Sequence, residues 1–322
     1  MNQSPISRWW TWIITIPSNR SVVFWALAMY ITIGSAVYQR LTGPTYPVSG
    51  IVKLGERAIP YVFKRSHADS MNSRVTVRTN DQSISGDLFW KRFKTNDKWT
   101  QVPMAFSSGL LDAQLPHQPM AGKLVYYVEL QKGEAKATLP AADPVVIRFR
   151  GDVPVFVMIP HILAMFLAMF LSIRAGLAYF SGERRLKKGT SWMLRIFFFG
   201  PVFWMVPYFS KEVNIKKLTY WTLGVLFVGG FVLGPLMQWY SFNAWWTGWP
   251  FGTDLTDNKT ALAFLAWVVA AFALTRAKNP ARWALAASII MFVVYLIPHS
   301  VLGSELDYSK LDKQTKQVEP TR

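Results

Sequence analysis

Five long apolar runs, separated by polar stretches, set the pattern of this chain. They lie at residues 22–38, 153–173, 219–240, 260–275 and 283–302. Each is close to the roughly 20 residues that an α-helix needs to cross the hydrocarbon core of a bilayer. The fourth run is the shortest and needs its flanking residues to do so. The pattern therefore predicts about five transmembrane helices.

The stretch between the first two runs, residues 44–152, has an alternating pattern instead. Val75 and Val77 alternate with charged and polar neighbours, which is typical of a half-buried strand. Turn residues such as Asn80-Asp81 and Lys132-Gly133 separate further extended runs. These runs lie at 87–93, 99–104, 110–115, 123–130 and 145–150. Short strands at this spacing predict a β-sandwich.

Part of this sandwich resembles a known fold. The sequence LPHQPMAGKLVYYVEL (115–130) is similar to the region around the penultimate strand of immunoglobulin-like and fibronectin type III domains. The resemblance implies that Tyr126 or Tyr127 takes the tyrosine-corner position of such a domain. The predicted fold class is thus an α-helical polytopic membrane protein with an inserted all-β immunoglobulin-like sandwich.

The basic residues predict how the chain is oriented. The net charge is +17, from 35 Lys and Arg against 18 Asp and Glu, and the basic residues mostly flank the apolar runs. No fold signature of a nucleic-acid binder accompanies them, so we expect no nucleic-acid partner. Residues 174–217 and 276–282 are rich in Lys and Arg, which predicts that both segments lie in the cytoplasm.

This orientation divides the chain into four parts. Residues 1–43 form a cytoplasmic segment and the first transmembrane helix, and residues 44–152 form the sandwich outside the cytoplasm. Residues 153–303 form a bundle of four further transmembrane helices. Residues 304–322 are a polar tail, on the same side as the sandwich and as the 241–259 loop.

Two features leave the number of spans open. The first apolar run has the length and charged lead-in of a signal peptide, and Gly34-Ser35-Ala36 fits a cleavage site, which would leave four spans. The stretch 192–209 is apolar and aromatic, but Pro201 and Pro207 interrupt it. It is more typical of an interfacial or re-entrant element than of a sixth span.

Two histidines fall inside the apolar runs, each directly after a proline. His161 lies in the second run and His299 in the fifth, while Asp254, Asp257 and Glu305 lie at the same predicted membrane face. Ionisable side chains inside a bilayer are functional candidates, and neutral imidazole is a common metal ligand. These five residues therefore predict a metal site, or alternatively a haem held by the two imidazoles.

Other roles compete with a metal or haem site. A proline frees the carbonyl one turn earlier in its helix, and a nearby imidazole can satisfy that carbonyl or one in a loop. Binding of a proton or a small ligand is a third alternative. Asp257 precedes an apolar run and fits a helix N-cap. The chain has no cysteine, which excludes disulfides and thiolate metal sites.

Five further residues are candidates for binding a partner. Trp245, Trp246 and Trp249 lie in the 241–259 loop, and Gly230 and Gly234 form a GxxxG step in the third apolar run. The tryptophans fit either an aromatic belt at the membrane interface or a ligand groove. The glycines allow another helix to approach closely, within this chain or in a partner protein.

The predicted sandwich also carries a basic stretch with interleaved aromatic residues. Lys91, Arg92, Lys94 and Lys98 lie around Phe93 and next to Trp99. We interpret this stretch as a solvated strand face in preference to a polyanion site.

Four segments carry a resemblance that spans most of the chain. They are PHILAMFLAM (160–169), FWKRFKTNDKWTQVPM (89–104), WTGWPFGTDLTDNKT (246–260) and YLIPHSVLGSELDY (295–308). In these segments the chain resembles an uncharacterised group of bacterial inner-membrane proteins. The resemblance implies a bacterial cytoplasmic membrane with the β domain in the periplasm, and it implies no activity.

These observations favour a protein that is not an enzyme. No nucleophile elbow, phosphate-binding glycine loop or spaced pair of catalytic carboxylates occurs in the sequence. We expect an accessory or scaffold protein that presents the sandwich and the 241–259 loop to a membrane or periplasmic partner. A metal- or haem-binding redox component that uses His161 and His299 is the alternative, and a small-molecule transporter is a second one.

The orientation can be tested with reporter fusions. A reporter that is active only in the cytosol should stay silent when it is inserted at Gly109 or fused to the tail, because both sites are predicted to lie outside. The same reporter inserted at Lys278 should be active. Activity at Gly109 would contradict the predicted orientation.

Overall fold

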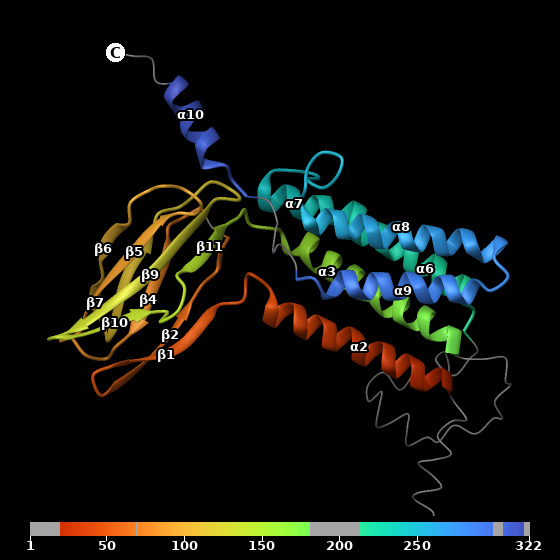
Figure 1. Ribbon diagram of the computed structural model, residues 1–322, viewed down its shortest axis with the longest axis horizontal. Helices are drawn as coiled ribbons and strands as arrows, with labels where there is room; N and C mark the ends of the chain where they lie inside the picture. The colour runs from red at the N-terminus through yellow and green to blue at the C-terminus, as the bar shows by residue number, and fades with distance from the viewer. Residues whose placement is uncertain (1–19, 69, 181–212, 299–304, 319–322) are drawn as a thin grey trace, which may run out of the picture. The chain divides into compact units, whose positions relative to one another are not determined.

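The computed structural model describes residues 20–68, 70–180, 213–298 and 305–318. The chain divides into two compact units. One unit comprises Met1–Arg40, Ile159–Gly234 and Asp257–Ile297, and its described part is helical. The other comprises Leu41–Met158, Pro235–Thr256 and Pro298–Arg322, and it holds the strands (Figure 1). We call these the helical unit and the sandwich unit.

The strands of the sandwich unit form separate sheets and pair antiparallel, except for the short β3, which runs parallel to β11. A three-stranded sheet has the order β4-β8-β7, and a larger sheet has the order β3-β11-β9-β5-β6, with β10 also paired to β9. A hairpin of β1 and β2 forms a further sheet. The bounds are β1 (Val48–Leu54), β2 (Arg57–Phe63), β3 (Ser66–His67), β4 (Ser73–Arg78), β5 (Ser85–Arg92), β6 (Thr100–Pro103), β7 (Ala105–Ser107), β8 (Leu110–Leu115), β9 (Lys123–Lys132), β10 (Ala135–Leu139) and β11 (Val145–Phe149).

Alternating apolar residues form the core of this unit. In β9 every second residue from Leu124 to Leu130 is buried, and in β4 the buried residues are Ser73, Val75 and Val77. Side chains from both larger sheets and from the hairpin meet in one cluster. Each large apolar side chain that is fully buried contributes roughly 1.5–3 kcal/mol to folding. The strands that the alternation predicts are confirmed here, within one or two residues at their ends.

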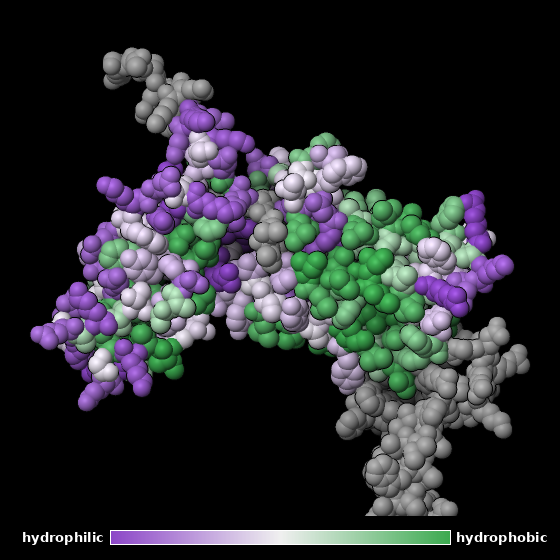
Figure 2. Space-filling model, viewed as in Figure 1, coloured by the Kyte–Doolittle hydropathy of each residue, from purple (hydrophilic) through white to green (hydrophobic). Residues whose placement is uncertain are grey.

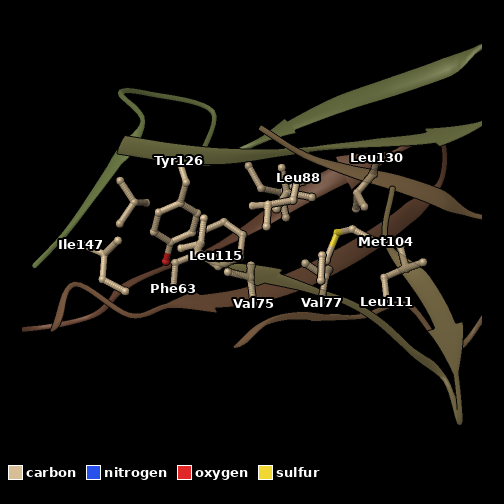
Figure 3. Close-up of a cluster of buried hydrophobic side chains, with 14 of the residues drawn as sticks. Phe63, Val75, Val77, Leu88, Met104, Leu111, Leu115, Tyr126, Leu130 and Ile147 are labelled. Atoms are coloured by element: carbon tan, nitrogen blue, oxygen red, sulfur yellow. The ribbon is translucent and has the colours of Figure 1, made fainter. Parts of the chain in front are cut away.

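Tyr126 fixes one end of this core. Its ring is 1% exposed and points toward Phe63, with 5.6 Å between the ring centres (Figure 3). Its hydroxyl donates a hydrogen bond of 2.8 Å to the carbonyl of Lys64, just after β2. Burial raises the pKa of this hydroxyl. A tyrosine corner bonds to backbone only a few residues upstream, so Tyr126 performs a related locking role with a partner 62 residues away.

The hairpin of β1 and β2 lacks the alternation of buried apolar and exposed polar residues that predicts the other strands. Its outward face carries apolar side chains, with Ile51 72% exposed and Val62 63% exposed. Gly50 and Pro60 lie within the two strands, where such residues usually argue against a strand. The hairpin is nevertheless held by seven register pairs, from Val48 with Phe63 to Leu54 with Arg57.

Helices form at all five predicted spans, and most of their ends extend beyond the apolar runs. They are α2 (Arg20–Thr42), α3 (Val155–Leu177), α6 (Ile215–Phe227), η4 (Val228–Leu233), α7 (Gly234–Phe242), α8 (Leu255–Arg276) and α9 (Pro280–Leu296). A short 3₁₀ turn, η2 (Ala178–Phe180), follows α3, and α10 (Tyr308–Val318) lies in the tail. The fifth apolar run was expected to reach residue 302, but α9 ends at Leu296, two residues before Pro298. The aromatic stretch 192–209 lies outside the described residues.

Three of these helical segments are long and apolar enough to cross a membrane. They are Val155–Phe180, Ile215–Phe242 and Leu255–Arg276, whereas the apolar Pro280–Leu296 has only 17 residues. Their outer faces expose large apolar side chains such as Leu163 and Phe272, and the helices show a broad hydrophobic surface in Figure 2. Such a surface is unusual for a soluble protein. These helices indicate a membrane protein.

Close backbone approach and polar contacts hold the helical unit together. Gly229 and Gly230 are buried, and a Cβ added to Gly230 would come within 2.6 Å of the Thr260 methyl group on α8. The Tyr295 hydroxyl donates to the carbonyl of Met165 at 3.0 Å. The Lys259 ammonium donates to the carbonyl of Ile297 at 2.6 Å, which satisfies the end of α9.

The contact at Gly230 can be tested with a matched pair of alanine variants. Gly230→Ala should destabilise the protein by about 1–3 kcal/mol, because the added methyl group overpacks the contact with α8. Gly224→Ala, in the same helical segment, adds its Cβ to open space. It should leave stability unchanged or raise it by up to about 1 kcal/mol through helix propensity. Thermal unfolding in detergent measures both, and equal behaviour of the two variants would contradict the packing role.

Candidate functional site

The end of β11 is joined directly to the end of α7 within the sandwich unit. The Gly151 backbone N–H donates to the carbonyl of Ser241 at 2.9 Å. Only glycine fits here, because an added Cβ would collide with the carbonyl of Tyr240. The Arg148 guanidinium lies 5.6 Å from the centre of the Phe242 ring. The sandwich unit therefore includes the last turns of a segment that is long and apolar enough to span a membrane.

The loop that follows α7, residues 243–254, is closed by its own hydrogen bonds. Asn243 has a φ of 55° and ends the helix by donating from its backbone to the carbonyl of Trp239 at 2.8 Å. The Gln238 side chain donates to the Thr247 hydroxyl at 2.5 Å. The backbone of Asp254 donates to the carbonyl of Thr247 at 2.9 Å. These bonds make Thr247 the centre of a compact loop. We call residues 243–254 the aromatic loop.

The aromatic loop holds its apolar side chains outward. Trp249 is 78% exposed and Phe251 is 82% exposed. Trp245 stacks on Trp239, with ring centres 4.9 Å apart and planes 19° apart. The Trp246 indole N–H donates to the carbonyl of Trp249 at 3.1 Å. The loop thus presents large apolar side chains from a backbone that its own contacts hold in place.

A group of charged side chains lies on the same unit, at the ends of β9 and β11. Glu305 accepts from the Lys94 ammonium at 2.9 Å, and it lies 3.6 Å from the Lys123 ammonium. Burial, and then the charge of Arg148, lower the pKa of Lys123, while Glu305 opposes this shift. Burial also lowers the pKa of Arg148, and the negative charges of Asp254 and Glu305 oppose it. Carboxylates from the aromatic loop and the tail therefore act on cations of the sandwich.

The tail is clasped onto the sandwich next to this group. Arg92 donates to Asp312 at 2.7 Å and to Asp97 at 2.6 Å, and its guanidinium lies 5.0 Å from the centre of the Tyr308 ring. The hydrogen bond from Arg92 lowers the pKa of Asp97. The Tyr308 hydroxyl accepts from the backbone N–H of Lys123 at 3.0 Å. Burial raises the pKa of Tyr308 to about 12.

A cleft of about 670 Å³ lies between the 92–97 turn and the tail. Its wall carries the side chains that hold the tail on the sandwich, Arg92, Asp312 and Tyr308. We call the contacts among these residues and Lys123 the clasp. Because Lys91, Arg92 and Lys94 have partners, these three cations are poor candidates for a polyanion site. Arg92 and Lys94 pair with carboxylates, and the Lys91 ammonium lies 5.0 Å from the centre of the Trp99 ring. The interpretation of this stretch as a solvated strand face stays a prediction.

In the helical unit, His161 has a structural contact. Its Nδ1–H donates to the carbonyl of Gly229 at 2.9 Å, and Gly229 belongs to η4, one turn of π-helix. A π-turn disturbs the ordinary helical pairing and is often found at functional positions. A Cβ added to Gly234 would lie 3.9 Å from the imidazole. The imidazole therefore has a structural contact, but its acceptor is a carbonyl of a neighbouring helix and not the proline-freed or loop carbonyl that the structural alternative named.

The residues predicted to bind a metal are distributed as follows. His299 lies outside the described residues. Among those that the structure does describe, no group of three or more His, Asp or Glu is arranged to hold a metal ion. Asp254 accepts from the Thr256 backbone at 2.7 Å and precedes α8, so Asp254 caps this helix, and Asp257 lies in its first turn. The N-cap prediction for Asp257 is wrong by one turn. The metal site itself stays a prediction.

The residues predicted to bind a partner have two kinds of surroundings. Gly230 is used for packing within the chain, against Thr260, and Gly234 lies near His161. Trp245 and Trp249 are exposed, while Trp246 is engaged with the loop backbone. A role for these five residues in partner binding stays a prediction. Among them, Trp245 and Trp249 expose the most side-chain surface.

The clasp was missed by sequence reasoning. Arg92 and Asp312 are 220 residues apart, and neither belongs to a recognisable motif. The signal that could have suggested it is a tail that carries Glu305, Asp307 and Asp312 opposite a basic stretch of the sandwich.

Comparison with known proteins gives no further guide to identity. No family model matches the chain, and no curated protein matches it either.

Removing the Tyr308 hydroxyl should loosen the tail. Tyr308→Phe leaves the buried N–H of Lys123 without its acceptor, which costs about 1–3 kcal/mol. Amide hydrogen exchange of residues 305–312 should then speed up by roughly fivefold or more. Tyr127→Phe is the matched control. Tyr127 lies on β9, the strand of Lys123, but its ring stacks on Phe89 and not on the tail. This variant should leave exchange in the tail unchanged, and equal effects of the two variants would contradict the clasp.

Proposed function

We propose that this protein is a membrane-anchored accessory or scaffold protein. It presents its β-sandwich and the aromatic loop to a membrane or periplasmic partner. The observation that carries this proposal is the joint between Gly151 and Ser241, together with the exposed Trp249 and Phe251. The joint fixes the base of the aromatic loop on the sandwich. The exposed side chains provide apolar surface of the kind that anchors an interface.

Attachment of the sandwich at several points supports the same proposal. α2 leads into β1, β11 leads into α3, and the tail after α9 is clasped by Arg92. A surface that is already tethered at the membrane loses less freedom on binding, and so binds more tightly for the same contacts. A scaffold that acts beside a membrane benefits from this arrangement.

The compartment and topology belong to the proposal as well. We infer five spans in a bacterial cytoplasmic membrane, with the sandwich in the periplasm. Support comes from the basic residues that cluster at the helix ends, with Lys216 and Lys217 at the start of α6. Arg276 ends α8, and Arg282 lies in the first turn of α9. Basic residues of this kind favour the cytoplasmic side.

We further propose that the sandwich is immunoglobulin-like. The pairing of β4 with β8 in one sheet, and of β5, β9 and β11 in the other, agrees with the B–E and C–F–G pairings of that fold. This likeness supports a fold and carries no information about a ligand.

Site-specific photo-cross-linking tests the docking role. A photoreactive amino acid in place of Trp249 or Phe251 should give one defined protein adduct in intact cells. The same amino acid in place of Lys136, which is exposed on β10, should give none. Equal labelling from all three positions, or labelling of lipid alone, would contradict docking through the loop.

Spectroscopy and metal analysis of the purified protein distinguish the scaffold role from the metal- or haem-binding alternative. The purified protein should show neither a Soret band nor stoichiometric metal. A bound metal that is lost in His161→Ala, and retained in the exposed-site variant His117→Ala, would establish the metal- or haem-binding alternative instead.

A further inference from the structure

Arg174, in the last turns of α3, is a buried cation with unused hydrogen-bond donors. Its side chain is 1% exposed. Its Nη2 donates to the Ser21 hydroxyl at 3.1 Å, but its Nε and Nη1 have no hydrogen-bond partner within the described parts of the chain. The guanidinium lies 5.2 Å from the centre of the Trp25 ring and 5.8 Å from that of Phe24. Two aromatic rings of α2 therefore hold a guanidinium whose donors are only partly satisfied.

Such a group calls for an anion. Arginine stays charged in proteins, and a buried charge without a partner is strongly unfavourable. The neighbouring aromatic rings attract the cation but provide no acceptor for its N–H groups. Ser21 supplies one neutral acceptor and no negative charge. The missing partner is thus an anionic group with oxygen acceptors.

The position of Arg174 along its helix indicates where that anion lies. Arg174 follows Val155, the first residue of α3, by 19 residues. At 1.5 Å per residue this separates the two by about 28 Å, close to the thickness of the hydrocarbon core, about 30 Å. If α3 enters the core near Val155, Arg174 reaches the headgroup layer of the opposite leaflet.

The neighbouring helix ends carry the same sign of charge. α9 packs against this end of α3, since a Cβ added to Gly176 would lie 2.6 Å from the side chain of Ser288. The turn that leads into α9 contains Arg276, Lys278 and Arg282. Within the described residues 172–180 and 273–285 there is no Asp or Glu. This end of the helical unit therefore attracts anions and supplies none from these segments.

We propose that Arg174 binds the phosphate group of an anionic phospholipid. The guanidinium offers its unpaired Nε–H and Nη1–H groups as charge-assisted donors to phosphate oxygens. Basic pockets between transmembrane helices at the cytoplasmic side are suited to such headgroups. The rings of Trp25 and Phe24 keep the guanidinium in place before the lipid arrives. This site is independent of the partner-docking role proposed for the aromatic loop.

Lipid binding by the delipidated full-length protein tests the proposal. Native mass spectrometry should show that phosphatidylglycerol stays bound at lipid concentrations where phosphatidylcholine does not. Arg174→Gln should weaken the binding of phosphatidylglycerol by roughly ten- to a hundredfold, the worth of a charge-assisted hydrogen bond. Arg282→Gln is the control, because Arg282 is an exposed cation at the same end of the unit. It should change the affinity by less than roughly threefold, as expected for an exposed charge.

The other outcomes count against the proposal. Equal losses in both variants would mean that only general positive charge attracts the lipid. Inorganic phosphate that displaces phosphatidylglycerol at comparable concentration would identify a free-anion site in place of a lipid site. If Arg174→Gln does not fold, the comparison of the two lipids on the wild-type protein still tests the proposal. The same affinity for the two lipids, or equal thermal stabilisation by both, would overturn the assignment.

Discussion

The hydrogen bond between Gly151 and Ser241 is the contact on which the position of the aromatic loop depends. It joins the end of β11 to the end of α7 backbone to backbone, and the absence of a side chain at residue 151 permits that approach. Because of this joint, the aromatic loop begins at a defined place on the sandwich. The interactions that Asp254 and Glu305 make with Arg148 and Lys123 then follow from proximity.

In the helical unit several backbone carbonyls are paired with side chains of other helices, whereas the buried hydroxyls of Ser172 and Thr219 have no partner among the described residues. The carbonyls of Gly229, Met165 and Ile297 each accept a hydrogen bond from a side chain of another helix. Lipid offers no alternative partner, so an unpaired group in this position is costly. Arg174 is a buried cation whose Nε and Nη1 have no partner among the described residues, and the proposed lipid site rests on this observation.

The net charge of the chain suggests a site for polyanions, but the paired charges of the sandwich unit argue against one. Although the protein carries a net charge of +17, Arg92 and Lys94 are held by carboxylates of the turn and the tail. Charge that is neutralised locally attracts few polyanions. The most exposed recognition surface of the described loop is apolar instead, at Trp249 and Phe251. A docking role for the aromatic loop agrees with that distribution.

The sequence by itself determined the apolar helices and most strands of the larger sheets. Their periodicity depends only on residues that are neighbours along the chain, as in β9, where alternate side chains are buried. It did not reveal the hairpin of β1 and β2, because Ile51 and Val62 place apolar side chains on the outward face. The tertiary structure alone decided that His161 meets Gly229 and that Arg92 meets Asp312. Such contacts join distant segments, and only packing in three dimensions determines which donor finds which acceptor.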